Sequence, residues 1–215
     1  LAALPSERTL DHALAWAWNL LTPVEQSTLA QLSVFATGFT LDAAEAVVDL
    51  SAFPDAPPVA TVVRALRNRS LVRAYVPPDL PTEVRLGLYD CVRVFVAPHC
   101  PPDAGVRHSR FFLTTAQSWC AGLSRHGGAE RQVRLTLEQH NLHAVLQRSL
   151  RMPPGTPGRA ATVGHVVLAL DSVLTARGPA AAHLALLDAA LAQTARQPVE
   201  ETLQAQLLDA RGNAR

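Results

Sequence analysis

The chain has 215 residues, of which 48% are hydrophobic and 17% charged, and its formal net charge at pH 7 is +1. This composition is apolar enough for a folded core and too low in charge for a disordered segment. All 19 basic residues are arginine, which excludes sites that need a lysine, such as a phosphate-binding loop, a Schiff base or a Ser-Lys dyad. The near-zero net charge argues against a protein that binds nucleic acid by bulk charge.

The cysteines and the most apolar stretch bear on the compartment. Cys91, Cys100 and Cys120 are odd in number and not closely paired, which favours reduced thiols in a cytoplasmic protein. The apolar stretch at residues 163–174 is short and contains His165 and Asp171, so we expect no contact with a membrane. The chain begins at Leu1 without a signal-peptide pattern, and we expect it to be part of a longer cytoplasmic protein.

The first helix is predicted from apolar residues at helical spacing. These residues are Leu10, Leu14, Trp16, Trp18, Leu20 and Leu21, and their spread around the helix predicts burial on more than one side. Trp16 and Trp18 could instead form a docking surface for a neighbouring domain, but the usual burial of aromatic side chains favours a place in the core.

Local signals mark three further helices. Thr22 and Glu25 form a capping box with Pro23 at the first helical position, and Gly38 is expected to end that helix. Thr40 is expected to cap a short third helix. A proline-rich loop then leads into a fourth helix with one apolar stripe, formed by Val59, Val62, Val63 and Leu66.

The hydrophobic period then changes from helical to alternating. Residues 71–76 and 84–88 alternate on either side of a proline turn, which predicts a β-hairpin. Asp90 is expected to be the N-cap of a fifth helix. Helices followed by a hairpin and a closing helix predict a winged-helix domain, which we assign to residues 1–100.

The second domain is assigned to residues 101–215, after a proline-rich boundary at residues 98–102. Every segment of it has helical spacing, and we expect Gly127 with Gly128 and the Pro/Gly stretch 152–158 to separate the helices. The fold class is therefore mainly α, a winged helix with a small hairpin followed by a helical superhelix.

An internal repeat suggests the architecture of this second domain. The sequence Leu-Thr-Ala-Arg-Gly at residues 174–178 recurs as Leu-Asp-Ala-Arg-Gly at residues 208–212, an offset of 34 residues. This is the period of tetratricopeptide repeats, in which each unit is a pair of helices. Pro198 is expected to open the next unit, and we expect the chain to end within the array.

A basic cluster near the end of the fourth helix is a candidate DNA contact, because a DNA-reading winged helix presents its recognition helix there. Its members are Arg64, Arg67, Arg69 and Arg73. A solvated face, or ion pairs to a neighbouring domain, is the favoured interpretation, because neither interleaved aromatic residues nor a wider basic field accompanies these arginines.

The sequence contains few signals of a metal site or a catalytic site. Two sparse sets of potential ligands occur, His140 with His143, and Cys91 with His99 and Cys100. Neither set has the companions of a metal site, so we expect no metal. Residues 155–159 are expected to form a linker because the phosphate-loop lysine is missing. Without a nucleophile motif such as Gly-x-Ser-x-Gly, we expect no catalytic residues and no enzyme activity.

Several separated motifs point, in order, to one family. They are Trp-Ala-Trp-Asn-Leu-Leu at residues 16–21, Glu25, Leu-Ser-Val-Phe at 32–35, Gly38-Phe39, Ala-Ala-Glu-Ala-Val at 43–47, Ser-Leu-Val at 70–72, Leu-Tyr-Asp-Cys-Val-Arg at 88–93, Arg107-His108 and Leu-Glu-Gln-His-Asn-Leu at 137–142. Over roughly residues 8–150 the chain resembles the module that follows the nucleotide-binding domain in bacterial STAND regulators. These are signal-transduction ATPases with numerous domains, among them AfsR-like and LuxR-like transcriptional regulators and some multidomain kinases. The later helices resemble the family's tetratricopeptide-like sensor array more loosely.

The resemblance implies a role beside a nucleotide. In the family the winged helix packs on the ATPase domain and helps to hold ADP, and a Met-His-Asp motif places a histidine near the phosphate. Leu88, Tyr89 and Asp90 occupy that motif's position, so Tyr89 and Asp90 are the candidate nucleotide-sensor residues. The aspartate is kept, but the phenol of Tyr89 cannot supply an imidazole contact.

We therefore expect a non-catalytic regulatory segment that relays a signal from the helical array to the upstream nucleotide-binding domain. By resemblance, ADP or ATP would bind in that upstream domain, and we expect no cofactor in this segment itself. Its expected partners are the upstream domain and a protein or small-molecule inducer on the array. The alternative is a DNA-binding winged-helix domain of a transcription factor.

Overall fold

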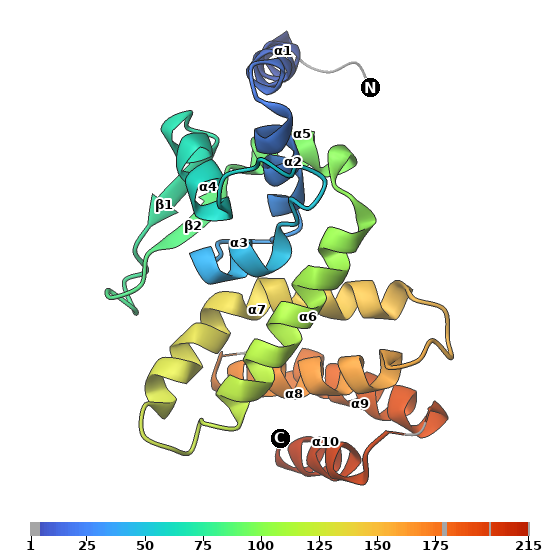
Figure 1. Ribbon diagram of the computed structural model, residues 1–215. Helices are drawn as coiled ribbons and strands as arrows, with labels where there is room; N and C mark the ends of the chain where they lie inside the picture. The colour runs from blue at the N-terminus through green and yellow to red at the C-terminus, as the bar shows by residue number, and fades with distance from the viewer. Residues whose placement is uncertain (1–4, 178–179, 198, 215) are drawn as a thin grey trace. The chain divides into compact units, whose positions relative to one another are not determined.

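The computed structural model describes residues 5–177, 180–197 and 199–214, which form ten α-helices, one 3₁₀ helix and a two-stranded antiparallel sheet (Figure 1). The chain divides into two compact units, residues 1–108 and 109–215. This division falls inside helix α6, Pro102–Cys120, and not at residue 100. The physical reason is that Arg107 and His108 pack within the first unit although their helix continues into the second.

The first unit contains five α-helices before α6. They are α1 Pro5–Asn19, α2 Pro23–Leu32, α3 Leu41–Val47, α4 Val59–Asn68 and α5 Asp90–Val96, the last followed by the 3₁₀ helix η1 Ala97–His99. The predicted capping box of α2 is confirmed, because Glu25 N donates to Thr22 Oγ1 at 3.3 Å and Thr22 N donates to Glu25 Oε2 at 2.8 Å. Thr40 caps α3 by accepting from Ala43 N at 3.2 Å, also as predicted.

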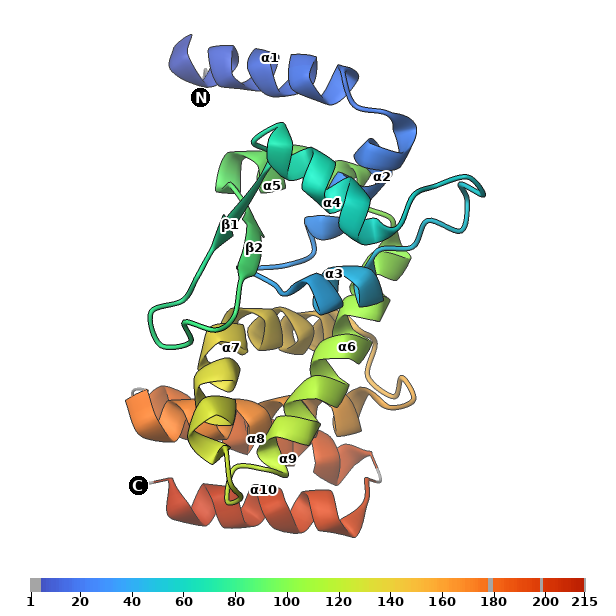
Figure 2. The same ribbon diagram turned by 60° about the vertical axis from the view of Figure 1, so that its left-hand side comes forward.

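The predicted hairpin is confirmed. Strands β1, Val72–Tyr75, and β2, Arg85–Leu88, pair antiparallel with Val72 opposite Leu88, and Figure 2 shows them side by side with a long loop between them. On its other edge β2 forms a bridge to Phe39, in which each backbone N–H of Phe39 and Leu86 donates to the other residue's carbonyl at 2.8 Å.

Because β2 lies between β1 and the Phe39 segment, all four of its residues are buried, including Arg85. Arg85 Nη2 donates to Gly38 O at 2.7 Å and Nη1 donates to Glu83 Oε1 at 3.1 Å. These bonds compensate for removing the guanidinium from water.

Two expectations for the first unit are wrong. Trp16 is not in the core, since it is 68% exposed, whereas Trp18 stacks on His99 with ring centroids 4.8 Å apart. The reason is that α1 packs on the rest of the unit along one side, against α5. Gly38 does not end α2, which ends at Leu32. Gly38 is needed instead because a Cβ there would overlap the Tyr75 hydroxyl.

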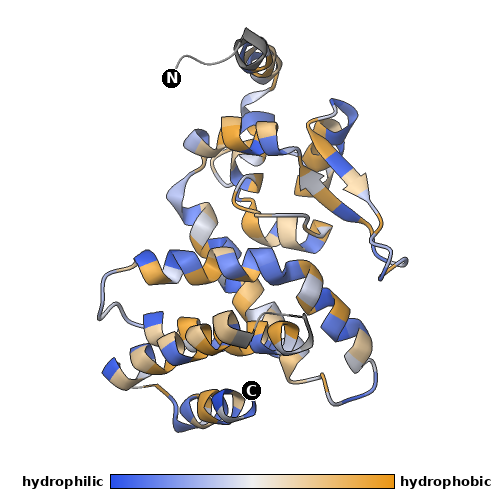
Figure 3. Ribbon diagram, turned by 180° about the vertical axis from the view of Figure 1, so that it is seen from behind, coloured by the Kyte–Doolittle hydropathy of each residue, from blue (hydrophilic) through white to orange (hydrophobic). Residues whose placement is uncertain are grey.

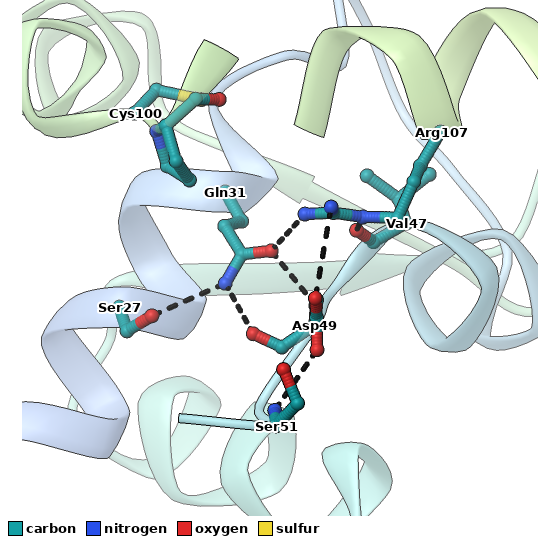
Figure 4. Close-up of polar contacts among 8 residues, drawn as sticks. Ser27, Gln31, Val47, Asp49, Ser51, Cys100 and Arg107 are labelled. Carbon is teal, nitrogen blue, oxygen red and sulfur yellow. Dashed lines mark hydrogen bonds and ion pairs between the residues drawn. The ribbon is translucent and has the colours of Figure 1, made fainter. Parts of the chain in front are cut away.

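Arg107 anchors the first half of α6 to the rest of the first unit (Figure 4). Its Nε donates to Val47 O at 2.6 Å, at the end of α3, and its Nη2 donates to Gln31 Oε1 at 2.7 Å, on α2. Gln31 in turn exchanges two hydrogen bonds of 2.8 Å with the backbone of Asp49. Three segments distant in sequence are thus joined through one amide and one guanidinium.

All regular secondary structure in the described part of the second unit is α-helix. After α6 come α7 Gly128–Arg151, α8 Arg159–Arg177, α9 Ala180–Arg196 and α10 Glu201–Asn213. Gly127 adopts a left-handed conformation before α7, with φ of 79°, and Gly155 and Gly158 have positive φ in the predicted linker. Each helix carries both hydrophobic and hydrophilic residues, as Figure 3 shows, and within the described ranges none has an apolar stretch long enough to cross a bilayer.

Helices α8, α9 and α10 pack against one another. The first copy of the internal repeat falls in the last turn of α8, and the second falls in the C-terminal half of α10. Gly178, the last residue of the first copy, and Pro198, which was expected to open the next unit, lie outside the described residues.

Arg159 ties three of these helices together from its position at the start of α8. Its buried guanidinium donates to Ser149 O at 3.0 Å and to Leu150 O at 3.4 Å, both at the end of α7, and to Gln193 Oε1 at 2.7 Å on α9. The last carbonyls of a helix have no partner within it, so a cation there satisfies them and the helix dipole together.

Candidate functional site

The two candidate nucleotide-sensor residues lie at the start of α5. Asp90 is its first residue and Tyr89 occupies the N-cap position without a side-chain cap, so the prediction that Asp90 caps this helix is wrong. One carboxylate oxygen of Asp90 accepts instead from Arg93 Nη2 at 3.1 Å, one turn along the helix. In the first turn a carboxylate still interacts favourably with the helix dipole, and the Asp90 side chain is 91% exposed.

Tyr89 lies beside a cation from the hairpin. The Arg73 guanidinium carbon is 6.0 Å from the centre of the Tyr89 ring and 5.4 Å from that of Tyr75, within range of a cation–π interaction. Tyr89 is 46% exposed. Tyr89 is therefore a solvent-accessible phenol next to an arginine.

The four arginines around the end of α4 differ in their contacts. Arg69 donates to Glu25 Oε1 at 3.2 Å, and Arg73 stacks as described. Arg64 and Arg67 are exposed on α4, and neither has an ion pair within the part of the chain that the structure describes.

Glu25 joins the capping box to this arginine cluster. Burial by itself raises the pKa of its carboxyl, but the hydrogen bonds from Thr22 and the charge of Arg69 outweigh burial, so the pKa lies below its ordinary value.

The sparse sets of potential metal ligands stay incomplete. His143 is half-buried, and burial, helped by the neighbouring charge of His140, lowers its pKa. Among residues 5–177, 180–197 and 199–214, no group of three His, Cys, Asp or Glu side chains is placed to hold a metal ion. All three cysteines are free thiols.

A cavity of about 500 Å³ within the second unit is the strongest candidate binding site. Helices α6, α8 and α10 each contribute polar side chains to its wall, namely Gln117 and Cys120, His165 and Asp171, and Gln206 and Asp209. Its volume lies within the roughly 300–1,000 Å³ typical of small-molecule sites.

A histidine on α9 holds the Asp171 side chain in place. Its Oδ1 lies 2.7 Å from His183 Nε2 on α9, and His183 is 4% exposed. Because an ionised carboxylate can only accept, the histidine nitrogen carries the proton of this hydrogen bond. The bond orients a carboxylate that would otherwise be free to rotate on the cavity wall.

Cys120, His165 and Asp171 share the cavity without forming a catalytic triad. In the described residues no hydrogen bond joins Cys120 to His165, and the Asp171 carboxylate is bonded to His183 instead. Burial, together with the charge of Asp171, raises the pKa of Cys120 to about 11. Burial also lowers the pKa of His165, although Glu200 acts in the opposite direction. At neutral pH the thiol is protonated, so the arrangement is suited to binding and not to nucleophilic attack.

No local pattern in the sequence identifies this site. The available signal was the presence of His165 and Asp171 in the most apolar helical stretch, where polar residues are costly unless they have partners or line a cavity. His165 and Asp171 line the same cavity as α10 only because helices about 40 residues apart in the sequence pack together. No local sequence pattern indicates this packing.

No protein-family model, no curated protein and no solved structure matches this chain.

Proposed function

We propose that this chain is a non-catalytic regulatory segment of a STAND-type signalling protein, which relays a signal from a helical sensor array to a nucleotide-binding domain. The observation that carries the proposal is a set of exposed apolar side chains on α1 and directly after it, Leu10, Trp16 and Leu20 at 47, 68 and 52% exposure. Large exposed apolar side chains close together in one segment favour a protein interface. They belong to the part of the sequence in which the resemblance to the family begins.

The order of elements supports a winged-helix identity for the first unit. Helix α2, the Phe39 bridge, α3, α4, the β1–β2 hairpin and α5 follow one another as in that fold. In this interpretation α5, with Tyr89 and Asp90 at its start, faces the nucleotide-binding domain.

The second unit supports the sensor role by offering a cavity of ligand size among stacked helices. A ligand or partner on this unit would favour one packing of the first unit on the nucleotide-binding domain over another. The division between the units falls within helix α6, so in this proposal the signal passes through that helix.

Association with the upstream nucleotide-binding domain tests the proposal. We expect residues 1–215 to bind that domain in the presence of ADP, and Trp16→Ala to weaken binding about 30-fold or more, as a central aromatic anchor would. Leu208→Ala is the matched control, because Leu208 is 56% exposed but lies on α10. Absence of an interface with and without ADP, or equal effects of the two variants, would contradict the relay.

DNA binding is a second candidate function, favoured by one observation. Arg64 and Arg67 are exposed on α4, the helix that would read DNA in a winged helix, and within the described ranges neither is occupied by an ion pair.

Gel shifts with a random duplex at low salt test this alternative. Binding that is lost in Arg64→Ala plus Arg67→Ala would support it, with the salt slope reduced by about 2, one for each phosphate contact. Arg110→Ala plus Arg125→Ala removes the same charge from exposed positions in the second unit and serves as control. A duplex that shows no shift would dismiss the DNA-binding function.

A further inference from the structure

We propose that the cavity between α6, α8 and α10 binds a small organic cation that carries a primary ammonium group. This proposal rests on the sensor role proposed above, and it names the chemical class of the inducer. It is argued from the charges, the acceptors and the size of the cavity.

The charge of the cavity wall is the first argument. Asp171 on α8 and Asp209 on α10 place carboxylates on two different helices that border the cavity, and among the side chains that the structure describes no arginine lines it. A site for an anion needs the opposite, because a buried negative ligand requires cations or backbone donors. Electrostatic complementarity therefore selects a positively charged ligand.

The remaining polar groups suit a donor-rich ligand. Gln117, Gln206 and Asn213 bring side-chain amides to the wall, each with one acceptor oxygen, and Thr175 brings a hydroxyl. An ammonium group has three N–H donors and no acceptor, so two carboxylates and several neutral oxygens can satisfy it as it leaves water. A bare metal ion fits less well, since no group of three potential ligand side chains converges within the described residues.

The fixed orientation of Asp171 is the third argument. His183 donates to Oδ1 from the α9 side, which leaves the second carboxylate oxygen without a contact from this histidine. An acceptor that is already oriented loses less conformational entropy when it binds. His165 does not offset the two negative charges at neutral pH, because burial lowers its pKa.

Apolar side chains complete the wall. Leu168, Ala121 and Ala210 border the cavity between the polar groups. A ligand with a short methylene chain between its ammonium groups, or behind one of them, would contact these residues while the charge reaches the carboxylates. A wall that combines carboxylates with apolar side chains fits an aliphatic amine better than a fully polar cation.

Isothermal titration calorimetry with the 215-residue chain tests the proposal. The amine probes are butylamine, 1,4-diaminobutane and spermidine, and the controls are 1,4-butanediol and succinate, which are neutral and anionic molecules of similar length. We expect at least one amine to bind at least tenfold more tightly than butanediol, because a charge-assisted hydrogen bond is worth about 1.5 kcal/mol or more. Succinate should not bind, and raising the salt from about 0.02 to about 0.5 M should weaken amine binding.

A charge-neutralising variant locates the site. Asp209→Asn should weaken amine binding about fivefold, which is the upper range for a solvent-accessible ion pair. Glu201→Gln is the matched control, since Glu201 is exposed on the same helix but does not line the cavity. Asp171→Asn should have a larger effect, with circular dichroism used to verify its folding; if it fails to fold, Asp209→Asn still decides the result.

The proposal is overturned if none of the three amines binds, if butanediol or succinate binds as tightly, or if Asp209→Asn and Glu201→Gln have the same effect. These outcomes are separable from failure of the relay, because calorimetry uses this chain alone. Trp16→Ala should weaken association with the nucleotide-binding domain and leave the amine affinity unchanged.

Discussion

Replacing Arg107 with alanine tests how α6 is held to the first unit. The guanidinium donates to Val47 O at 2.6 Å and to Gln31 Oε1 at 2.7 Å. A hydrogen bond from a charged donor contributes about 1.5–3 kcal/mol. The Val47 carbonyl ends α3, where no later turn of that helix can satisfy it, so this bond should contribute at full value.

The second bond should contribute less. Gln31 Oε1 still accepts from Asp49 N at 2.8 Å after the arginine is removed, so it is not left without a donor. We therefore expect Arg107→Ala to lower the free energy of unfolding of the first unit by about 2–3 kcal/mol. Arg107→Lys keeps the charge but replaces only some of the guanidinium N–H donors. It should lower the free energy of unfolding about half as much.

Urea unfolding monitored by tryptophan fluorescence measures this loss. In a Trp119→Phe background the signal comes from Trp16 and Trp18, which both lie in the first unit. Arg110→Ala is the control, because Arg110 is exposed and lies one turn further along α6, and a surface change of this kind alters stability by less than about 0.5 kcal/mol.

The reasoning would be refuted by a loss within about 0.5 kcal/mol of the control. A double-mutant cycle gives a second criterion. If Arg107 and Gln31 interact as the structure shows, the loss caused by Arg107→Ala should be smaller in a Gln31→Ala background. An equal loss in both backgrounds would assign the effect to something other than this network.

Three further predictions concern single residues. Arg159→Leu should lower the free energy of unfolding by about 3 kcal/mol, because it removes the charged donor that Ser149 O, Leu150 O and Gln193 Oε1 share. An unchanged midpoint in a urea titration would contradict this. The folded-state pKa of Glu25 is lowered, so its contribution to stability is present above its ordinary pKa of 4.5 and is lost as pH falls below that value. Glu25→Gln should therefore be less stable than the parent chain at pH 7 and should lose less stability on acidification, which denaturant midpoints at pH 7 and about pH 3 will measure. Burial raises the pKa of Cys120 to about 11, so iodoacetamide at pH 8 should modify the exposed Cys91 first; mass spectrometry that finds Cys120 modified faster would show that its burial is wrong.

Local signals in the sequence predicted most of the secondary structure. The capping box at Thr22 and Glu25, the hairpin and the helix break at Gly127 and Gly128 depend on residues a few positions apart, and the structure has all three. The errors of this kind are small. Asp90 lies one position inside its helix and not at the cap, since an aspartate is favourable at both places.

Burial was less predictable than helix position. The apolar spacing of α1 predicted a helix correctly, but it could not distinguish the side that packs on α5 from the side that carries Trp16. A hydrophobic stripe indicates a surface that packs against a partner, but it does not indicate whether that partner belongs to the same unit.

The sequence by itself determined where most helices and the hairpin form, because backbone hydrogen bonding, capping and side-chain period act over a few residues. Only the tertiary structure decided that Arg85 and Arg159 are buried and that His183 holds Asp171. It also placed Asp171 and Asp209 around one cavity. A charged residue can be buried only where distant segments bring matching partners, so the positions that bear on function depend on contacts that no local pattern contains.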